Sequence, residues 1–269
     1  MDSIADIVSR IATDSGMPPE VLEHALTAPL TDDERLVRKA EAYNSTVGEL
    51  KYYDCPLCLN RGDRAVIADG TLKIQPCACM IKRENMRRLQ ESGLEDVVMR
   101  YTFAAFETPD DECATCKDKA MEYARDGDGK WFIITGKSGS GKTHLCTAIA
   151  AGLIRQCHDV RYVRWREIAP RLKALINERE GYEEEANALK TVDVLYLDDF
   201  LKGSVSAADI NLAYEIINAR YSVRRLRTII STERSMDAII KIDEALGSRI
   251  YERCKGFVLT APKRNWRLR

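Results

Sequence analysis

Short apolar runs alternate with longer amphipathic stretches over the second half of the chain. The runs have the length and composition of buried strands, and the stretches between them repeat apolar residues at helical spacing. Because strands that alternate with helices pair in parallel, with helices covering both faces, this pattern predicts an α/β domain with a parallel sheet. The predicted strands are residues 131–135, 160–163, 192–197, 228–232 and 256–260, and the predicted helices are residues 142–157, 168–177, 207–221 and 236–254.

The first part of the chain has a purely helical pattern. Isoleucine or valine at positions 4, 7, 8 and 11 lines one face of a helix, and Pro18-Pro19 opens a second short helix. Thr31 followed by Glu34 has the spacing of a capping box, which predicts the start of a third helix. These helices either pack on one another as a small bundle or dock against a partner, and the pattern leaves both open.

These patterns divide the chain into four segments. A short, polar, proline-bearing stretch around Thr108-Pro109-Asp110 is typical of a linker. The predicted segments are N-terminal helices (residues 1–50), a cysteine-rich zinc-binding module with a basic helix (51–106), a linker (107–116) and the α/β domain (117–269).

The charge balance and the cysteines narrow the class of protein. The 269 residues carry 41 Lys and Arg against 42 Asp and Glu, which excludes a globally basic protein that coats nucleic acid, so any such contact must be local. Asp2 and Asp6 interrupt what would be the basic start of a signal peptide, and no apolar run reaches the roughly 18 residues of a membrane helix. Nine cysteines, partly in pairs, favour a metal site in a reducing compartment, so we expect a cytoplasmic location.

One segment matches the phosphate-binding loop G-x-x-x-x-G-K-[ST] without a mismatch. A predicted strand leads into it and a predicted helix follows, which is the context that this loop requires. Its glycines let backbone N–H groups surround a phosphate chain at the positive end of the helix. We expect Lys142 to reach the β- and γ-phosphates of ATP and Thr143 to place its hydroxyl on Mg²⁺. The segment is Gly136-Lys137-Ser138-Gly139-Ser140-Gly141-Lys142-Thr143.

A second run supplies acidic residues for the same site. The apolar residues 194–197 end in Asp198 and Asp199, and ligands of parallel sheets bind at the carboxyl ends of the strands. Asp198 is predicted to hold Mg²⁺, often through water, and Asp199 to orient or deprotonate the attacking water. The alternative is a pair of solvated acids at the end of a strand.

These motifs resemble those of the AAA+ ATPases of the DnaC/DnaI helicase-loader and IstB group. The loop at 136–143, the strand before Asp199, Arg220-Tyr221, the strand at 228–232 and Ser248-Arg249 carry the resemblance, over roughly residues 100–269. It implies a five-stranded parallel sheet of order 5-1-4-3-2 and assembly with copies of the same chain. It also implies that Arg249 completes the ATP site of a neighbouring subunit, with Arg253 as the second choice; a cation at a helix end is the plain alternative.

The chain departs from this group at the end of its fourth strand. The group usually has an Asn there that senses the γ-phosphate, whereas this chain reads Ser231-Thr232-Glu233. An anionic Glu233 would be repelled by a phosphate unless it were protonated or turned away, and Thr232 or Ser231 is then the neutral donor in its place. We therefore expect ATP hydrolysis that is slow or differently sensed.

Four cysteines have the spacing of a zinc site. Cys55 and Cys58 form C-x₂-C, eighteen residues follow, and Cys77 and Cys79 form C-x-C, which together supply four thiolates for a closed, structural Zn²⁺ site. The alternative is four thiols without metal. Loaders of the DnaI type and their phage relatives look similar here, with a Cys-rich module before a basic helix. A further C-x₂-C, Cys113 with Cys116, has no second pair and is interpreted as structural or incidental.

Two local groups of cations are candidates for single-stranded DNA. The long segment after the second strand combines cations with one tryptophan, which suits sequence-tolerant binding, although Glu183–Glu185 would repel phosphates and a solvated helix face is as good an interpretation. The C-terminal residues form a second group. The first comprises Arg164, Trp165, Arg166, Arg171 and Lys173; the second comprises Lys263, Arg264, Trp266, Arg267 and Arg269.

The resemblance implies an ATP-dependent loader of the replicative DNA helicase. The ATPase half would bind ATP, Mg²⁺ and single-stranded DNA and self-associate, while the N-terminal helices and zinc module would bind the helicase. In this view ATP acts as a switch, whose hydrolysis releases the assembly. Two alternatives stay open: an IstB-type transposition helper, and a zinc-bearing adapter that binds nucleotide without hydrolysing it.

Overall fold

The structure is a computed structural model, which describes residues 30–51, 53–91, 98, 100–127 and 129–268. The chain forms two compact units, Met1–Cys77 and Ala78–Arg269, each described here by itself. The two helices predicted before residue 30 lie outside the described residues, as do residues 92–94 that follow the basic helix.

The first unit combines a helix with a β-hairpin. Helix α3 (Asp32–Asn44) begins at the predicted capping box, in which Thr31 and Glu34 satisfy each other's backbone N–H groups. The hairpin of β1 (Asp63–Ala68) and β2 (Thr71–Pro76) was not predicted. Its two-residue turn, Asp69-Gly70, has positive φ at both positions (52° and 65°), which is the type of turn that an Asp-Gly pair favours.

The side chain of Asn44 attaches the helix to the hairpin. Its amide donates to the carbonyl oxygen of Ala65 and accepts from the Ala65 N–H, both at 2.9 Å. Among residues 30–51 and 53–77, the buried apolar side chains are two alanines and three cysteines: Ala40, Ala65, Cys55, Cys58 and Cys77. So small an apolar core cannot supply much of the unit's stability.

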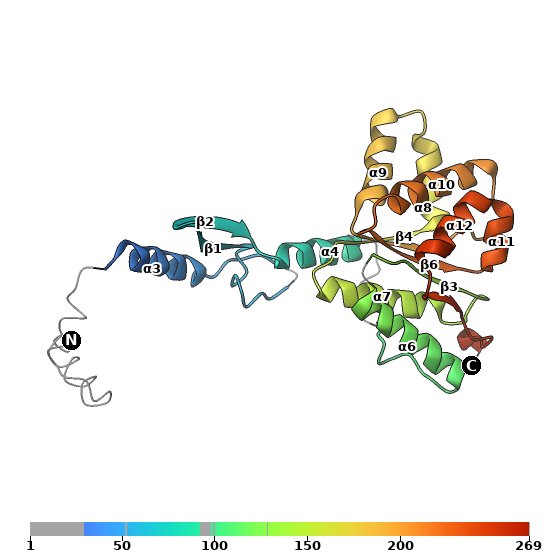
Figure 1. Cartoon of the computed structure of the whole chain (residues 1–269), viewed down its shortest axis with the longest axis horizontal. Coiled ribbons are helices and arrows are strands. Elements are labelled where there is room, and N and C mark those ends of the chain that lie inside the picture. Colours follow the sequence, from blue (N-terminus) through green and yellow to red (C-terminus); the bar gives the residue numbers. More distant parts are fainter. Residues whose placement is uncertain (1–29, 52, 92–97, 99, 128, 269) are drawn as a thin grey trace. The chain divides into compact units, whose positions relative to one another are not determined.

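The second unit contains the predicted parallel sheet. The strands lie in the order β4-β5-β6-β3-β7 and pair in parallel, which is the expected order 5-1-4-3-2 read from the other edge. Figure 1 shows this sheet with helices on both faces, which confirms the α/β fold class. The strands are β3 (Phe132–Thr135), β4 (Val160–Arg164), β5 (Val194–Asp198), β6 (Arg227–Thr232) and β7 (Val258–Thr260).

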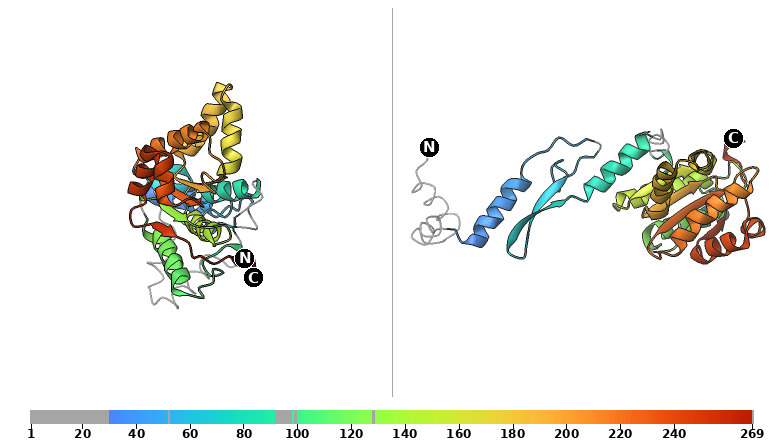
Figure 2. Two further views of the ribbon diagram at one scale, coloured as in Figure 1. Left: turned by 90° about the vertical axis from the view of Figure 1, so that its right-hand side faces the viewer. Right: turned by 90° about the horizontal axis from the view of Figure 1, so that it is seen from above.

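Two apolar clusters separate the sheet from its helices. One cluster lies under α6 (Asp111–Asp126) and α7 (Lys142–Arg155), and α4 (Cys79–Glu91) contacts α7 and β4. The other cluster lies on the opposite face, where the remaining helices gather (Figure 2). These are α8 (Trp165–Leu175), α9 (Arg179–Thr191), α10 (Ala207–Tyr221), α11 (Met236–Ile242) and α12 (Glu244–Arg253).

Two segments differ from their predicted boundaries. Residues 111–116, placed in the linker, form the start of α6, because Asp110 caps the helix by accepting from the Cys113 N–H at 2.8 Å. Cys113 and Cys116 are buried in the core, and burial raises their pKa values to about 12 and about 11, which disfavours the thiolate form. The helix predicted over 236–254 is divided at Asp243, which caps α12 by accepting from the Leu246 N–H at 2.6 Å.

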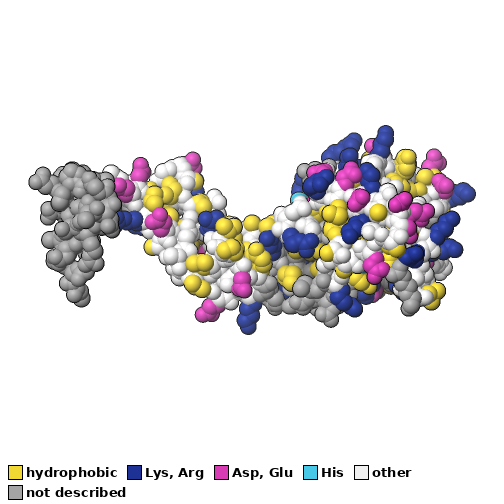
Figure 3. Space-filling model, turned by 90° about the horizontal axis from the view of Figure 1, so that it is seen from below, with side chains coloured by type: hydrophobic (Ala, Val, Ile, Leu, Met, Phe, Trp, Pro, Cys, Tyr) yellow, Lys and Arg dark blue, Asp and Glu magenta, His cyan; other side chains and the backbone are white. Residues whose placement is uncertain are grey.

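The surface of the second unit intermixes both signs of charge. Lys and Arg lie among Asp and Glu over the face in Figure 3 rather than in one basic field. Within the residues that the structure describes, none of the helices combines the length and apolar character that crossing a membrane requires.

Candidate nucleotide-binding site

The predicted phosphate loop joins β3 to α7 at the carboxyl end of the sheet. Gly139 and Gly141 have φ of 77° and 90°, a region that favours glycine, and Gly141 immediately precedes α7. The side chain of Lys142 is buried, and its Nζ donates to the carbonyl oxygen of Lys137 at 2.8 Å. Burial lowers the pKa of Lys142, against the opposing attraction of Glu233 and Asp199. A glycine-containing loop that leads into the N-terminus of a helix and carries a buried lysine has the features that phosphate binding requires.

The two residues predicted to hold Mg²⁺ meet at the base of this loop. The hydroxyl of Thr143 donates to Asp198 Oδ1 at 3.1 Å. The same buried carboxylate accepts from Tyr196 at 3.1 Å, from Tyr162 at 3.0 Å and from Ser231. Hydroxyl and carboxylate oxygens are the ligands that Mg²⁺ prefers, so Thr143 and Asp198 fit this ion, with the other hydroxyls fixing the carboxylate.

Asp199 lies in a turn that points its side chain into the site. Its φ is 52°, a left-handed conformation that costs a residue with a side chain about 1 kcal/mol. Two hydrogen bonds to β6 hold the turn: the Asp199 N–H donates to the Ser231 hydroxyl at 3.0 Å, and the Phe200 N–H donates to the Ser231 carbonyl at 2.8 Å. Strain of this kind is characteristic of functional sites.

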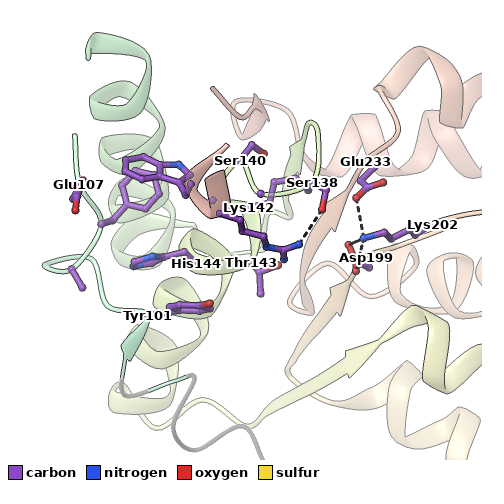
Figure 4. A pocket seen from close by; sticks show the side chains of 16 residues that line it. Tyr101, Glu107, Ser138, Ser140, Lys142, Thr143, His144, Asp199, Lys202 and Glu233 are labelled. Carbon is purple, nitrogen blue, oxygen red and sulfur yellow. Dashed lines mark hydrogen bonds and ion pairs between the residues drawn. The ribbon is translucent and has the colours of Figure 1, made fainter. Parts of the chain in front are cut away.

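Lys202 neutralises the glutamate that departs from the family pattern. Its Nζ lies 2.9 Å from Glu233 Oε1 and 3.1 Å from Asp199 Oδ2, between the two carboxylates (Figure 4). The hydrogen bond from Lys202 lowers the pKa of Glu233, so Glu233 is an anion. Glu233 was expected to be either protonated or turned away from the site. The structure shows neither arrangement: Glu233 lines the cavity as an anion, and Lys202, which belongs to no motif, balances its charge.

Thr232, predicted as a substitute phosphate sensor, is directed elsewhere. It is fully buried, and its hydroxyl donates to the carbonyl oxygen of Phe200 at 2.7 Å and accepts from the Arg234 N–H at 3.1 Å. Thr232 is not among the described residues that line the cavity. Ser231 contacts the site indirectly, because its hydroxyl donates to Asp198, the predicted Mg²⁺ ligand.

A cavity of about 280 Å³ opens over the loop. One end is polar, with Lys142, Asp199, Lys202 and Glu233; the other is aromatic, with Tyr101, Phe106, His144 and Trp266. His144 stacks on Tyr101 at 4.8 Å between ring centroids, and its Nε2 lies 2.8 Å from the Thr102 carbonyl oxygen. Phosphates suit the first end and a flat base suits the second, so the cavity matches the polarity of a nucleotide.

The two candidate arginine fingers have different surroundings. Arg253 is buried and donates to the carbonyl oxygens of Gly129 and Leu226, which makes it a structural residue. Arg249 is half-buried on α12, donates to the Ala245 carbonyl oxygen at 2.8 Å, and does not line the cavity of its own chain.

The four predicted zinc ligands lie together. The sulfur atoms of Cys55, Cys58, Cys77 and Cys79 are buried and within 4.8 Å of one another. The Cys55 and Cys77 sulfurs are 3.7 Å apart, which fits the spacing of about 3.8 Å that tetrahedral Zn–S bonds impose. The Gly62 N–H also points to Cys58 Sγ at 3.4 Å, a contact that orients a thiolate ligand. The donor set and its spacing are compatible with zinc.

Several residues of the two predicted DNA-binding groups are engaged within the described part of the protein, and Arg269 lies outside the described residues. Trp165 is buried against Phe200, so its ring is not available to stack on bases. Glu185 forms ion pairs with Arg171 at 3.2 Å and with Arg161 at 2.8 Å, which neutralises part of the first group. In the second group, Trp266 and Arg267 line the cavity.

The comparisons with known proteins agree with this geometry. The family described as IstB-like ATP binding protein matches residues 85–255, more than half of the chain. The chain is 32% identical over 221 residues to the phage-like element PBSX protein XkdC of Bacillus subtilis, covering 77% of this chain and 82% of that protein. It is 26% identical over 183 residues to the replicative helicase loader DnaC of Escherichia coli K12, covering 65% and 73%.

Solved structures share the fold of the second unit. The crystal structure of the DnaC helicase loader matches with a TM-score of 0.51 and 21% identity, covering 61% of this chain and 98% of that one. The replication initiator DnaA bound to AMPPCP and single-stranded DNA matches with a TM-score of 0.50 and 22% identity, covering 60% and 50%. The sheet order, the phosphate loop and these matches lead to one conclusion: the chain belongs to the family of IstB-like ATP-binding proteins, with the AAA+ fold of the helicase loaders.

Proposed function

We propose that this protein is an ATPase that loads the replicative DNA helicase. The observation that carries the proposal is the pairing of Thr143 with Asp198 beneath a complete phosphate loop, in a chain whose relatives include proteins named replicative helicase loaders. Lys142 would bind the phosphates, and Thr143 and Asp198 would hold Mg²⁺. Asp199, aimed into the cavity, would take the proton of the attacking water.

The cysteine-rich unit is proposed to be the helicase-binding part. It lies mostly outside residues 85–255, the part that the family match covers, so it is an addition to the ATPase fold. Zinc held by the four cysteines would give this small unit its stability.

The proposal is tested by co-purification with the replicative helicase of the same cell. We expect the full chain to bind the helicase and ATP to change the amount retained, because the γ-phosphate biases a two-state assembly. Recovery of a transposase and no helicase would favour an IstB-type transposition helper, the alternative supported by the family match. A chain that binds ATP without turnover, with or without single-stranded DNA, would instead be a nucleotide-binding adapter.

The single-stranded DNA contact is proposed for the arginines at the start of α8. Arg164 and Arg166 have exposed side chains, although Arg164 also pairs with Glu167 at 2.9 Å, whereas Arg171, farther along the helix, pairs with Glu185 at 3.2 Å. In the turnover assay, single-stranded DNA should stimulate the native chain and should no longer stimulate Arg166→Ala. Equal stimulation of both would remove α8 from the DNA site.

Arg249 is proposed to act on the ATP of a neighbouring copy of the chain. Arg249→Ala should leave ATP affinity unchanged and lower the turnover of assembled protein about a thousandfold, because the finger stabilises charge that develops only during phosphoryl transfer. A steady-state ATPase assay measures the loss.

A mixing experiment separates this role from a structural one. Arg249→Ala chains retain the loop lysine, and Lys142→Ala chains retain the finger, so mixing two inactive proteins should restore turnover at mixed interfaces. An inactive mixture, or full activity of Arg249→Ala alone, would show that Arg249 is not a finger.

A further inference from the structure

The last described residues of the chain lie directly on the phosphate loop. After β7, the Ala261 N–H donates to the Thr135 carbonyl oxygen at 2.7 Å, at the point where β3 enters the loop. The Trp266 N–H then donates to the Gly139 carbonyl oxygen at 2.9 Å, and Arg267 donates to the Ser138 hydroxyl at 3.2 Å. We call residues 261–267 the C-terminal strap.

The strap packs closely against the loop. A Cβ atom at Gly139 would lie 2.1 Å from Asn265 Oδ1, and one at Gly136 would lie 3.0 Å from Ala261 Cβ. Gly139 occupies a position that the motif leaves free, and its φ of 77° is what favours glycine there. The contact is therefore part of how the loop is built.

We infer that the strap is part of the nucleotide site, with Arg267 binding phosphate oxygens from within the same chain and Trp266 closing the base end. The inference rests on the proposed ATP site. It adds two residues to that site: Arg267, which would bind phosphate oxygens, and Trp266, which would contact the base. Both residues line the cavity together with Lys142.

The chemistry of Arg267 supports a phosphate partner. Its guanidinium donates to the neutral Ser138 hydroxyl at 3.2 Å, and a phosphate oxyanion would form a shorter and stronger bond with it. In Figure 4 the side chain of Ser138 lies beside Glu233, at the end of the cavity that also holds Asp199 and Lys202. Residues 255–269 contain no Asp or Glu, so the strap supplies no carboxylate of its own to compete with a phosphate.

Trp266 forms one side of the aromatic end of the cavity. Its ring lies 5.9 Å from the ring of Phe106, tilted by 54°, and its Nε1 would be 3.4 Å from a Cβ at Gly141. The other two tryptophans, Trp131 and Trp165, are buried in the apolar core. A nucleotide in the cavity should therefore change mainly the fluorescence of Trp266.

Binding and strap docking are then coupled: a nucleotide that touches Arg267 and Trp266 stabilises the docked strap, and the docked strap raises the affinity for nucleotide by the same factor.

The test compares Arg267→Ala with Lys263→Ala, which removes one exposed cation of the same strap that does not line the cavity. We expect Arg267→Ala to weaken ATP binding about tenfold or more, and ADP binding less, because a lost charge-assisted hydrogen bond is worth about 1.5–3 kcal/mol. Lys263→Ala should bind as the native chain does, and Arg267→Lys should recover part of the affinity. In native protein ATP should change tryptophan emission, and in Trp266→Phe it should not.

Equal ATP affinity in Arg267→Ala and the native chain, with binding still lost in Lys142→Ala, would overturn the inference and leave the ATP site intact. An unchanged fluorescence response in Trp266→Phe would likewise exclude Trp266 from contact with the base. Absence of ATP binding in the native chain would overturn the proposed function itself.

Discussion

Lys142→Ala should lower the affinity for ATP about a hundredfold or more. The buried ammonium group is the loop's own cation and lies among backbone N–H groups that serve the same phosphates, so its loss removes several charge-assisted hydrogen bonds at once. Isothermal titration calorimetry with ATP and Mg²⁺ measures the change.

The effect can be separated from misfolding. Burial lowers the pKa of Lys142, so its charge opposes folding at neutral pH and offsets the packing that alanine removes; a Tm close to that of the native chain is expected and shows that the variant is folded. Lys137→Ala is the matched control, because Lys137 is the other lysine of the loop, its side chain is exposed, and its carbonyl group survives the substitution. Unaltered ATP affinity in Lys142→Ala would remove the loop from the nucleotide site.

Replacing Cys55 and Cys58 together with alanine should unfold residues 30–77 and leave ATP binding unchanged. The unit buries little besides alanines and the cysteines themselves, so metal binding worth about 10–16 kcal/mol would be its main source of stability. Metal analysis should find about one Zn per native chain and none in the variant. Hydrogen exchange should show rapid exchange of the amides of β1 and β2 in the variant.

The chain contains a matched control for this experiment. Cys113 and Cys116 have the same C-x₂-C spacing, but they belong to α6 and are buried in the apolar core, so their replacement by alanine should leave the zinc content unchanged. Slow exchange of the hairpin amides in metal-free protein, or zinc retained after loss of Cys55 and Cys58, would rule out a structural zinc site.

The parts of the site that follow from local sequence were predictable. The phosphate loop is contiguous, and Asp198 and Asp199 end an apolar run, so each could be found without knowing the fold. Strand order then explains Tyr162, which lies beside Tyr196 in the β4–β5 register and so reaches Asp198 from the next strand. This residue could have been found once the order of strands was assumed.

Other features depend on packing between segments distant in the sequence. Trp165 looked suited to stack on bases, but α8 turns it into the core against Phe200. Lys202 follows Asp199 in a loop without a motif, and its importance appears only where β6 brings Glu233 beside it. Helix α9 was missed as a separate helix, and it carries Glu185, which neutralises Arg171 and Arg161. The cations were visible in the sequence, but their partners were not.

The position of the strap also decides how the protein should be handled in the laboratory. The Trp266 N–H is bound to the Gly139 carbonyl oxygen, and Trp266 and Arg267 line the cavity. A tag joined directly behind the strap would bring its linker close to the cavity, where the linker would compete with nucleotide for the same space. Affinities are therefore best measured on protein that carries no tag directly behind the strap, so that the value obtained belongs to the nucleotide alone.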